Sequence, residues 1–184
     1  MRCFVGIELP SQIRKEVKRI QEELREVELD AKWVEFENLH ITLKFLGEVG
    51  EGKLSKIKEV ISNLSFLFKP FTVGISKIGA FPKVIRPRVL WIGVEPFDNL
   101  IKIIEYLEEE FSKLGFPREK RELHPHITLA RVRSLKNTSR LKEKVESSKL
   151  EKKQWQIDSV ILFKSILTPR GPIYEEIFKR SLTP

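Results

Sequence analysis

The tetrapeptide His-Ile-Thr-Leu occurs twice in this chain of 184 residues, at His40–Leu43 and at His126–Leu129. In a β-strand successive side chains point to opposite faces, so each copy would place His and Thr on one face and Ile and Leu on the other. Each copy therefore predicts a strand with an imidazole and a hydroxyl on one side and aliphatic anchors on the other. Two such strands in one chain indicate two imidazoles that face one substrate.

The repeat is longer than the tetrapeptide. When the sequence is shifted by 86 positions, the separation of His40 and His126, the segment Arg2–Pro10 (RCFVGIELP) falls on Arg88–Pro96 (RVLWIGVEP). Both segments are typical of buried strands that end at a proline, which cannot donate to a strand ladder. A helical pattern follows each of them, and the His strand comes next. The sequence therefore predicts one strand–helix–strand unit that has been used twice.

The periodicity of apolar residues places the remaining elements. Helices are expected at about 11–27, where Ser11 is a candidate cap, and at about 52–64, 97–114 and 137–150; further strands are expected at 71–78, 155–163 and 173–178. We predict a single domain over residues 1–184, with an internal repeat of about 1–80 and 86–170. The expected fold class is α+β: bilobal, with two pseudo-two-fold-related antiparallel sheets, helices outside and a central cleft.

Charge and cysteine content limit the functional classes. Lys and Arg number 34 against 26 acidic residues, and this net charge of +8 favours a polyanionic partner such as nucleic acid. The single cysteine, Cys3, excludes an intrachain disulfide and a cysteine-based zinc cluster, and we expect it in the core. No apolar run approaches the roughly 18 residues that a membrane helix needs. We expect a cytoplasmic monomer that does not bind membranes.

The paired His-x-Thr motif suits chemistry on a phosphodiester. Imidazole titrates near neutral pH, so one histidine can accept a proton while the other donates one. The hydroxyls of Thr42 and Thr128 can donate to phosphate oxygens from the same strand face as His40 and His126. Such a site needs no metal and no cofactor. The alternative is a duplicated fold that keeps both histidines as packing residues.

Further candidates flank the two motifs. Arg131 lies five residues after His126, so on a regular strand it would point to the opposite face, and only a twist or a bulge would turn it toward a phosphate. Lys44 and Phe45 follow the first motif; Phe45 could stack on a base, although its spacing favours the core. The pair Arg86 and Arg88 precedes a buried strand and is a candidate RNA contact.

Two other kinds of site are weighed against this one. His124 and His126 could hold a metal ion together with His40, although the proline between the first two counts against this. Gly47–Lys53 has the glycine and lysine spacing of a phosphate-binding loop, but Leu54 stands where that loop needs Ser or Thr. We interpret this segment as a turn before a helix.

Taken together, these residues resemble a known family. The chain is similar to the RNA 2′,3′-cyclic phosphodiesterases, the LigT-like or 2′-5′ RNA ligase proteins of the two-histidine phosphoesterase superfamily. The similarity covers essentially the whole chain and is carried by the doubled His-x-Thr and by the segments MRCFVGIELP, HITLKFLGEV, RVLWIGV, HPHITLARV and ILFKSILTPRGPIYEEI. One His-x-Thr is weakly specific, whereas two copies inside these flanks are highly specific.

The resemblance implies an enzyme that hydrolyses RNA 2′,3′-cyclic phosphate ends, including those of tRNA fragments, to 2′-phosphomonoesters. It implies that His40 and His126 are catalytic and that Thr42, Thr128 and Arg131 hold the phosphate. We assign His126 as the base and His40 as the acid, although the repeat makes the two nearly equivalent. The alternatives are 2′-5′ ligation of tRNA halves at the same site, or a module that binds RNA ends without catalysis.

Overall fold

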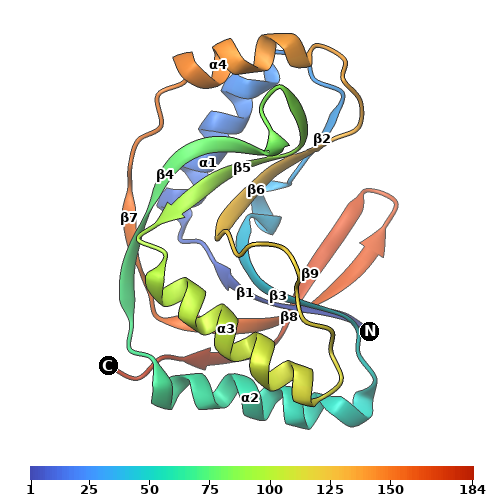
Figure 1. Cartoon of the computed structure of the whole chain (residues 1–184), viewed down its shortest axis with the longest axis vertical. Coiled ribbons are helices and arrows are strands. Elements are labelled where there is room, and N and C mark those ends of the chain that lie inside the picture. The colour runs from blue at the N-terminus through green and yellow to red at the C-terminus, as the bar shows by residue number, and fades with distance from the viewer.

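Nine strands and four helices form the fold, and the computed structural model describes residues 1–184 (Figure 1). The strands are β1 (Arg2–Glu8), β2 (Ala31–Trp33), β3 (His40–Glu48), β4 (Phe71–Lys83), β5 (Arg86–Glu95), β6 (His126–Val132), β7 (Gln154–Ile157), β8 (Ser159–Thr168) and β9 (Gly171–Ser181). The helices are α1 (Ser11–Arg25), α2 (Leu54–Leu67), α3 (Asp98–Lys113) and α4 (Leu141–Ser147).

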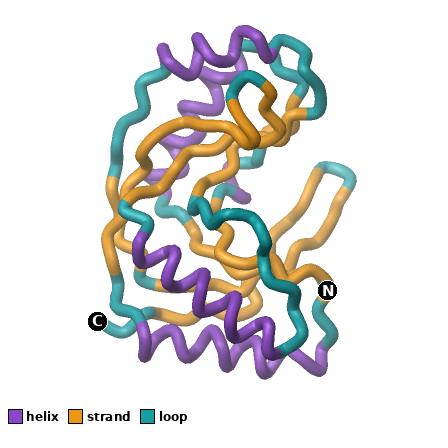
Figure 2. Tube along the Cα trace, viewed as in Figure 1, coloured by secondary structure: helices purple, strands orange, loops and turns teal.

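All strands belong to one curled antiparallel sheet in the order β7-β4-β5-β6-β3-β1-β8-β9, with β2 added to β6 (Figure 2). The predicted α+β class with antiparallel strands is confirmed. The two predicted sheets are the two halves of this one sheet, and they meet where Ile41 of β3 pairs with Ile127 of β6. We call β3, β1, β8 and β9 the lower half and β6, β5, β4 and β7 the upper half.

The strand order of the sheet has an internal symmetry: each strand of the upper half has an equivalent strand at the matching position of the lower half. Exchanging β3 with β6, β1 with β5 and β4 with β8 leaves the central order unchanged. This symmetry supports the proposed internal repeat. However, β4 follows the first His strand and pairs with β5, whereas β8 follows the second and pairs with β1. Each half of the sheet therefore contains strands from both proposed repeats.

The helices cover the outside of the two halves. In Figure 1, α1 and α4 lie beside the upper half, and α2 and α3 lie along the lower half. The face of α1 that carries Ile13, Val17 and Ile20 is completely buried, as the helical spacing of these residues predicts. Gln21 on the same helix donates to the backbone oxygen of Leu129, which ties α1 to the second His strand (2.9 Å).

Some predicted boundaries were wrong. Ser11 does not cap α1: it is the first helical residue, and Pro10 at the cap position makes no side-chain capping hydrogen bond. Helix α4 ends at Ser147, short of the expected end at Leu150, because the backbone of Ser148 is already extended. Gly115 ends the segment after α3 as expected, with a positive φ of 94° that favours glycine.

One hydrophobic core of 37 residues runs through both halves. Ile41 and Ile127 are fully buried at its centre, and Cys3 lies in it as predicted, with 3% exposure. Burying an aliphatic side chain of this size stabilises a fold by roughly 1.5–3 kcal/mol. The backbone positions of the two His strands are therefore held by the core beneath them. None of the four helices has the length and apolar composition needed to cross a membrane.

Candidate active site

The two His-Ile-Thr-Leu segments are neighbours at the centre of the sheet. Because Ile41 pairs with Ile127, His40 and His126 stand on the same face of the sheet, opposite the core. Both imidazoles and both threonines are half-buried, whereas the aliphatic residues between them are buried. The alternation predicted from the sequence is confirmed for both copies.

The two imidazoles are fixed in the same way. Nδ1 of His40 donates to the backbone oxygen of Asn38, and Nδ1 of His126 donates to the backbone oxygen of His124, each at 2.6 Å. A carbonyl oxygen can only accept, so the proton of each neutral ring lies on Nδ1 and Nε2 carries the lone pair. Nε2 of His40 accepts from the hydroxyl of Thr42 at 2.7 Å. Each histidine can therefore exchange a proton through Nε2.

Burial makes both imidazoles prefer the neutral form. It lowers the pKa of His40 from 6.5 to about 4, and positive charge on His126 lowers this pKa further, so the two rings are close enough to influence each other. Burial also lowers the pKa of His126, and electrostatic repulsion from the nearby His124 and Arg131 lowers this pKa further. Near neutral pH the site therefore holds two neutral imidazoles beside a fixed guanidinium.

The depressed pKa of His40 predicts acid sensitivity of the fold. Between pH 6.5 and 4 the unfolded chain binds a proton at this histidine and the folded protein does not. Stability must therefore fall as the pH falls through this window, by about 3 kcal/mol for this residue. We expect the free energy of unfolding, measured with denaturant, to fall by about 3 kcal/mol less in His40→Gln than in the wild type between pH 7 and pH 4. Equal losses in the two proteins would contradict the assignment.

A β-bulge turns Arg131 toward the histidines. Leu90 pairs with Ala130 but Trp91 pairs with Thr128, so Leu129 is an extra residue in β6. The extra residue reverses the alternation, and Arg131, opposite Val89, returns to the face of His126. The sequence required such a bulge for Arg131 to reach a phosphate, and the structure contains it.

The first His strand has a matching bulge with a different outcome. Val5 pairs with Lys44 and Gly6 with Thr42, so Leu43 is the extra residue. This bulge brings Phe45, the counterpart of Arg131, to the cleft face, where it is 62% exposed. The expectation that Phe45 packs in the core was wrong. The two halves therefore differ at the cleft: one presents a guanidinium and the other a phenyl ring.

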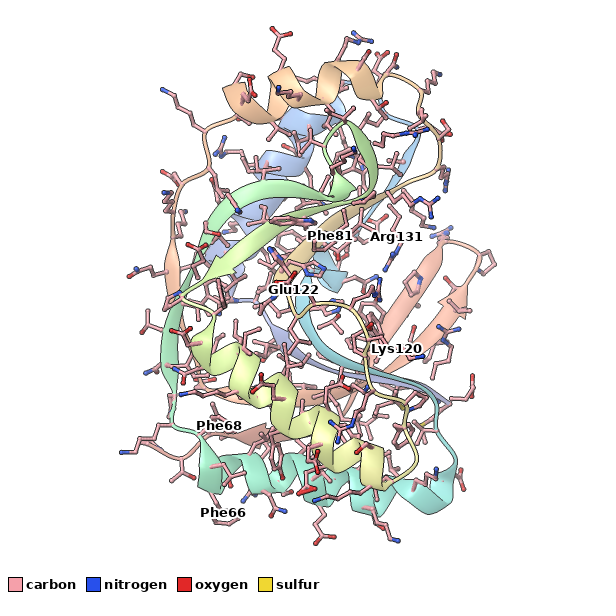
Figure 3. The ribbon with its side chains drawn as sticks, viewed as in Figure 1. Phe66, Phe68, Phe81, Lys120, Glu122 and Arg131 are labelled. Atoms are coloured by element: carbon pink, nitrogen blue, oxygen red, sulfur yellow. The ribbon has the colours of Figure 1, made fainter.

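A cavity of about 1390 Å³ joins most of the candidate residues. Its lining includes Thr42, Phe45, Arg86, Arg88, His126, Thr128 and Arg131. His40 is joined to this lining through its hydrogen bond to Thr42. Figure 3 shows Arg131 and Phe81 at the upper end of the cleft and Glu122 below them.

Lys44 is buried in an ion pair, which does not fit the RNA contact predicted from the sequence. Its side chain is 6% exposed, and its ammonium lies 2.9 Å from a carboxylate oxygen of Glu108. The ammonium also donates to the backbone oxygen of Pro117 (2.6 Å), and Glu108 accepts from the backbone N–H of Glu119. The bulge leaves Lys44 on the core side of β3, where it anchors α3 and the loop that precedes β6.

Aromatic residues that the sequence did not identify surround the two imidazoles. Phe4 lies beside His40 with ring centroids 4.9 Å apart, and Tyr174 meets the same imidazole edge-on at 5.2 Å. Around His126, Phe81 is at 5.1 Å and Trp91 at 6.4 Å. These contacts join strands that are distant in the sequence, and no local pattern marks these aromatic residues.

The structure also shows where the two alternative kinds of site lie. The segment Gly47–Lys53 links β3 to α2, and the ammonium of Lys53 is bonded to the backbone oxygen of Leu114 (2.9 Å). The rings of His124 and His126 are 6.3 Å apart, and no three His, Cys, Asp or Glu side chains lie together as metal ligands would. We therefore interpret Gly47–Lys53 as the turn that starts α2.

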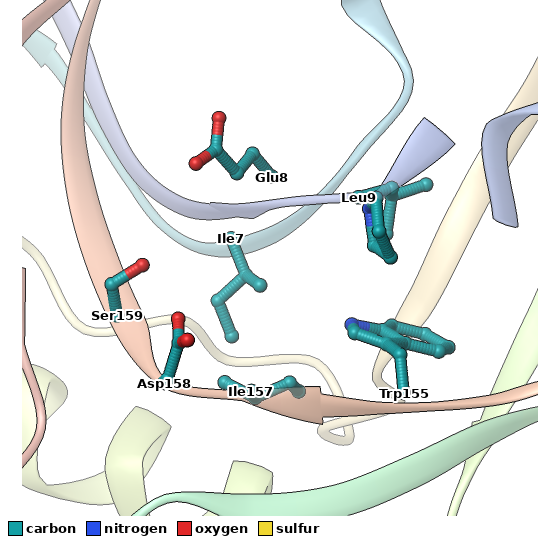
Figure 4. A pocket seen from close by; sticks show the side chains of 8 residues that line it. Ile7, Glu8, Leu9, Trp155, Ile157, Asp158 and Ser159 are labelled. Atoms are coloured by element: carbon teal, nitrogen blue, oxygen red, sulfur yellow. The ribbon is translucent and has the colours of Figure 1, made fainter. Parts of the chain in front are cut away.

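A second, smaller cavity of about 160 Å³ lies at the end of β1 (Figure 4). Ile7, Trp155 and Asp158 are among its lining residues, none of which is a histidine and none of which lines the large cavity. The indole nitrogen of Trp155 is buried without an acceptor. This cavity has no imidazole, so the chemistry of the paired histidines belongs to the large one.

Comparison with known proteins gives the same family from sequence and from structure. The family model described as "LigT like Phosphoesterase" matches twice, over residues 7–91 and 92–174. An RNA 2′,3′-cyclic phosphodiesterase of Methanocaldococcus jannaschii is 42% identical over 178 residues, which are 96% of this chain and 98% of that protein.

Solved structures agree with this. A crystal structure of a Thermus thermophilus protein has a TM-score of 0.82 at 28% identity and covers 99% of this chain and 98% of its own. Escherichia coli LigT in complex with 3′-AMP has a TM-score of 0.79 at 25% identity and covers 100% of this chain and 98% of its own.

Proposed function

The chain belongs to the LigT-like phosphoesterase family, and we propose that it hydrolyses RNA 2′,3′-cyclic phosphate ends to 2′-phosphomonoesters. The observation that carries this proposal is the matched pair of imidazoles. Both rings are oriented by Nδ1 through a backbone carbonyl, and both can exchange a proton at Nε2 on one face of the sheet. The bulge at Leu129 adds the Arg131 guanidinium on that face.

The reaction follows from these groups. One imidazole removes a proton from water, and the resulting hydroxide attacks phosphorus in line with O3′. The bond from phosphorus to O3′ breaks, the other imidazole protonates O3′, and the phosphate stays on O2′. Arg131 and Thr128 donate to the non-bridging oxygens, and so does Thr42 once its hydroxyl has turned from Nε2 of His40 to the phosphate. These donors stabilise the charge that grows there. Two imidazoles and these donors supply every proton and charge that the reaction needs, so we propose that it proceeds without a metal ion.

The positions of the two imidazoles relative to the large cavity favour one assignment of roles, because His126 lines it and His40 does not. The pKa of His40 falls to about 4, so this imidazole is neutral at physiological pH and suits the base. His126 lies at the open cavity, where the bound phosphate anion would raise its pKa and favour the protonated form. We therefore propose His40 as the base and His126 as the acid, the reverse of the assignment made from the sequence.

Product analysis tests the function. We expect an oligoribonucleotide with a 2′,3′-cyclic phosphate end to yield a 2′-phosphomonoester and a free 3′-hydroxyl, at the same rate with and without excess EDTA. Phosphorus-31 NMR separates the 2′- and 3′-phosphate products. Loss of activity in EDTA that added metal restores would contradict the metal-free mechanism.

The same assay distinguishes the alternatives. When an RNA with a 5′-hydroxyl is added in excess, hydrolysis predicts unchanged product, whereas a ligase would form a longer RNA with a 2′-5′ linkage. An RNA-end binding module would retain the cyclic end over hours. Either result would replace the proposed hydrolysis.

A further inference from the structure

Charge is unevenly distributed over the large cavity. Its upper part, formed by the end of β4, the start of β5, β6 and the residues after β6, is lined by four arginines and no carboxylate: Arg86, Arg88, Arg131 and Arg133. The lower part, formed by β3, α3 and the loop before β6, has three glutamates against two cations: Glu108, Glu119, Glu122, Lys44 and Arg121. A polyanion is therefore attracted to the upper part alone.

The cations of the two parts also differ in their partners. In the lower part, Lys44 is paired with Glu108 at 2.9 Å and Arg121 with Glu119 at 3.1 Å. In the upper part, none of the four arginines belongs to an ion pair, and all are exposed. Because no carboxylate neutralises them, their full charge is available to phosphate groups.

The unpaired arginines continue the line of the active site. Strand β6 runs from His126 to Val132, and Arg131 lies opposite Val89 near the start of β5. Since the strands are antiparallel, the start of β5 with Arg86 and Arg88 lies beside the end of β6. Arg133 extends this end, where its backbone N–H donates to the backbone oxygen of Asp30 (2.8 Å). The order along the cleft is therefore histidine, phosphate-binding Arg131, and then the three further arginines.

We propose that Arg86, Arg88 and Arg133, the basic tract, bind backbone phosphates of the nucleotides that precede the cyclic end. The enzyme then prefers single-stranded RNA oligomers to a mononucleotide. This inference rests on the proposed function, because the cyclic end must lie between His40 and His126. The cavity volume of about 1390 Å³ exceeds the roughly 300–1,000 Å³ of a small-molecule site, which agrees with more than one nucleotide.

Phe81 adds a contact of the kind that single-stranded RNA uses. It lies at the end of β4 between the active site and the basic tract, 5.1 Å from the ring of His126, and is half-buried. Accessible aromatic rings beside unpaired arginines are typical of single-strand binding grooves, where bases stack and phosphates are neutralised. We expect the base next to the cyclic end to contact this ring.

The test compares two substrates with the same cyclic end. These are adenosine 2′,3′-cyclic phosphate and an eight-nucleotide RNA that ends in it, each measured as kcat/KM over a range of salt concentrations. We expect the wild type to prefer the oligomer at least about tenfold at low salt. Three phosphate contacts predict that log kcat/KM for the oligomer changes by about −2 per tenfold increase in salt, beyond the change for the mononucleotide.

Variants test which arginines produce the preference for the oligomer. In Arg86→Gln/Arg88→Gln/Arg133→Gln we expect the ratio of the two kcat/KM values to fall toward one, mainly through a higher KM for the oligomer. The matched control is Arg2→Gln/Lys56→Gln/Lys102→Gln, three exposed cations outside the cavity, which should keep the wild-type ratio.

Three results would overturn the inference. A wild-type ratio near one with equal salt dependence would show that no upstream phosphate is bound. A ratio that survives in the basic-tract variant but falls in Lys32→Gln/Arg170→Gln would place the RNA beside the turn between β8 and β9, next to which the ammonium of Lys32 on β2 lies. If the wild type hydrolyses neither substrate, the proposed function fails and this inference fails with it.

Discussion

We expect replacement of His40 or His126 with glutamine to lower kcat for cyclic-phosphate hydrolysis by about 10²–10⁴-fold, the range for removal of one general acid or base. Glutamine keeps a polar side chain of similar length but cannot take up or release a proton at neutral pH. Both imidazoles stand on the cleft face above a buried isoleucine pair, so neither change disturbs the core. Single-turnover rates at saturating substrate measure the effect.

His124→Gln provides the matched control. His126 donates to the backbone oxygen of His124, which glutamine keeps, and the exposed His124 imidazole packs against Trp91 with centroids 4.6 Å apart. We expect kcat to change by less than about tenfold, below the range for a lost acid or base. If His40→Gln or His126→Gln retains wild-type turnover while it is folded by circular dichroism, the two-histidine mechanism is wrong.

A sulfur leaving group separates the acid from the base. When O3′ is replaced by sulfur, the leaving group is a thiolate, whose conjugate acid has a pKa of about 8.5, and it departs with little need for protonation. We expect this substrate to restore most of the lost rate to His126→Gln and little to His40→Gln. The opposite pattern would return the roles to those assigned from the sequence.

We expect replacement of Arg131 with glutamine to lower kcat/KM by about 10²–10³-fold, the loss typical of one preorganised donor to a developing oxyanion. Arg131 lies on the face of His126, belongs to no ion pair, and its counterpart in the other half is Phe45. No second cation therefore occupies the equivalent position. Arg131→Lys should recover only part of the loss, because an ammonium keeps the charge but cannot bind two oxygens as a guanidinium does.

Arg140→Gln is the control for this change. Arg140 is exposed beside α4 and outside the cavity, so its loss removes the same charge without touching the phosphate. We expect its kcat/KM to remain near the wild-type value at moderate salt, where distant exposed charges are screened. Equal effects of Arg140→Gln and Arg131→Gln would mean that net charge alone, and not a phosphate contact, explains the loss.

Much of the fold was predictable because its local patterns are strong. The alternation in His40–Leu43 and His126–Leu129 reflects a sheet with one face on the core, and the helical spacing of Ile13, Val17 and Ile20 reflects a helix with one buried side. These patterns depend on neighbouring residues in the chain. They predicted both histidines on strand faces opposite the core without any knowledge of which strands pair.

Strand pairing and register were not predictable in the same way. The exchange of β4 and β8 between the halves, and the bulges at Leu43 and Leu129, depend on contacts between segments far apart in the sequence. One extra residue in a strand reverses the face of every residue after it. Alternation alone therefore placed Arg131 on the wrong face and could not distinguish the exposed Phe45 from the buried Lys44.

The sequence by itself thus determined the doubled His strand, the α+β class and the residues able to transfer protons. Only the tertiary structure decided that His40 and His126 share one face, that Arg131 joins them and that the unpaired arginines gather at one end of the cleft. The physical reason is that a local pattern sets which face of an element is buried, whereas the register between distant strands sets which side chains meet across the sheet.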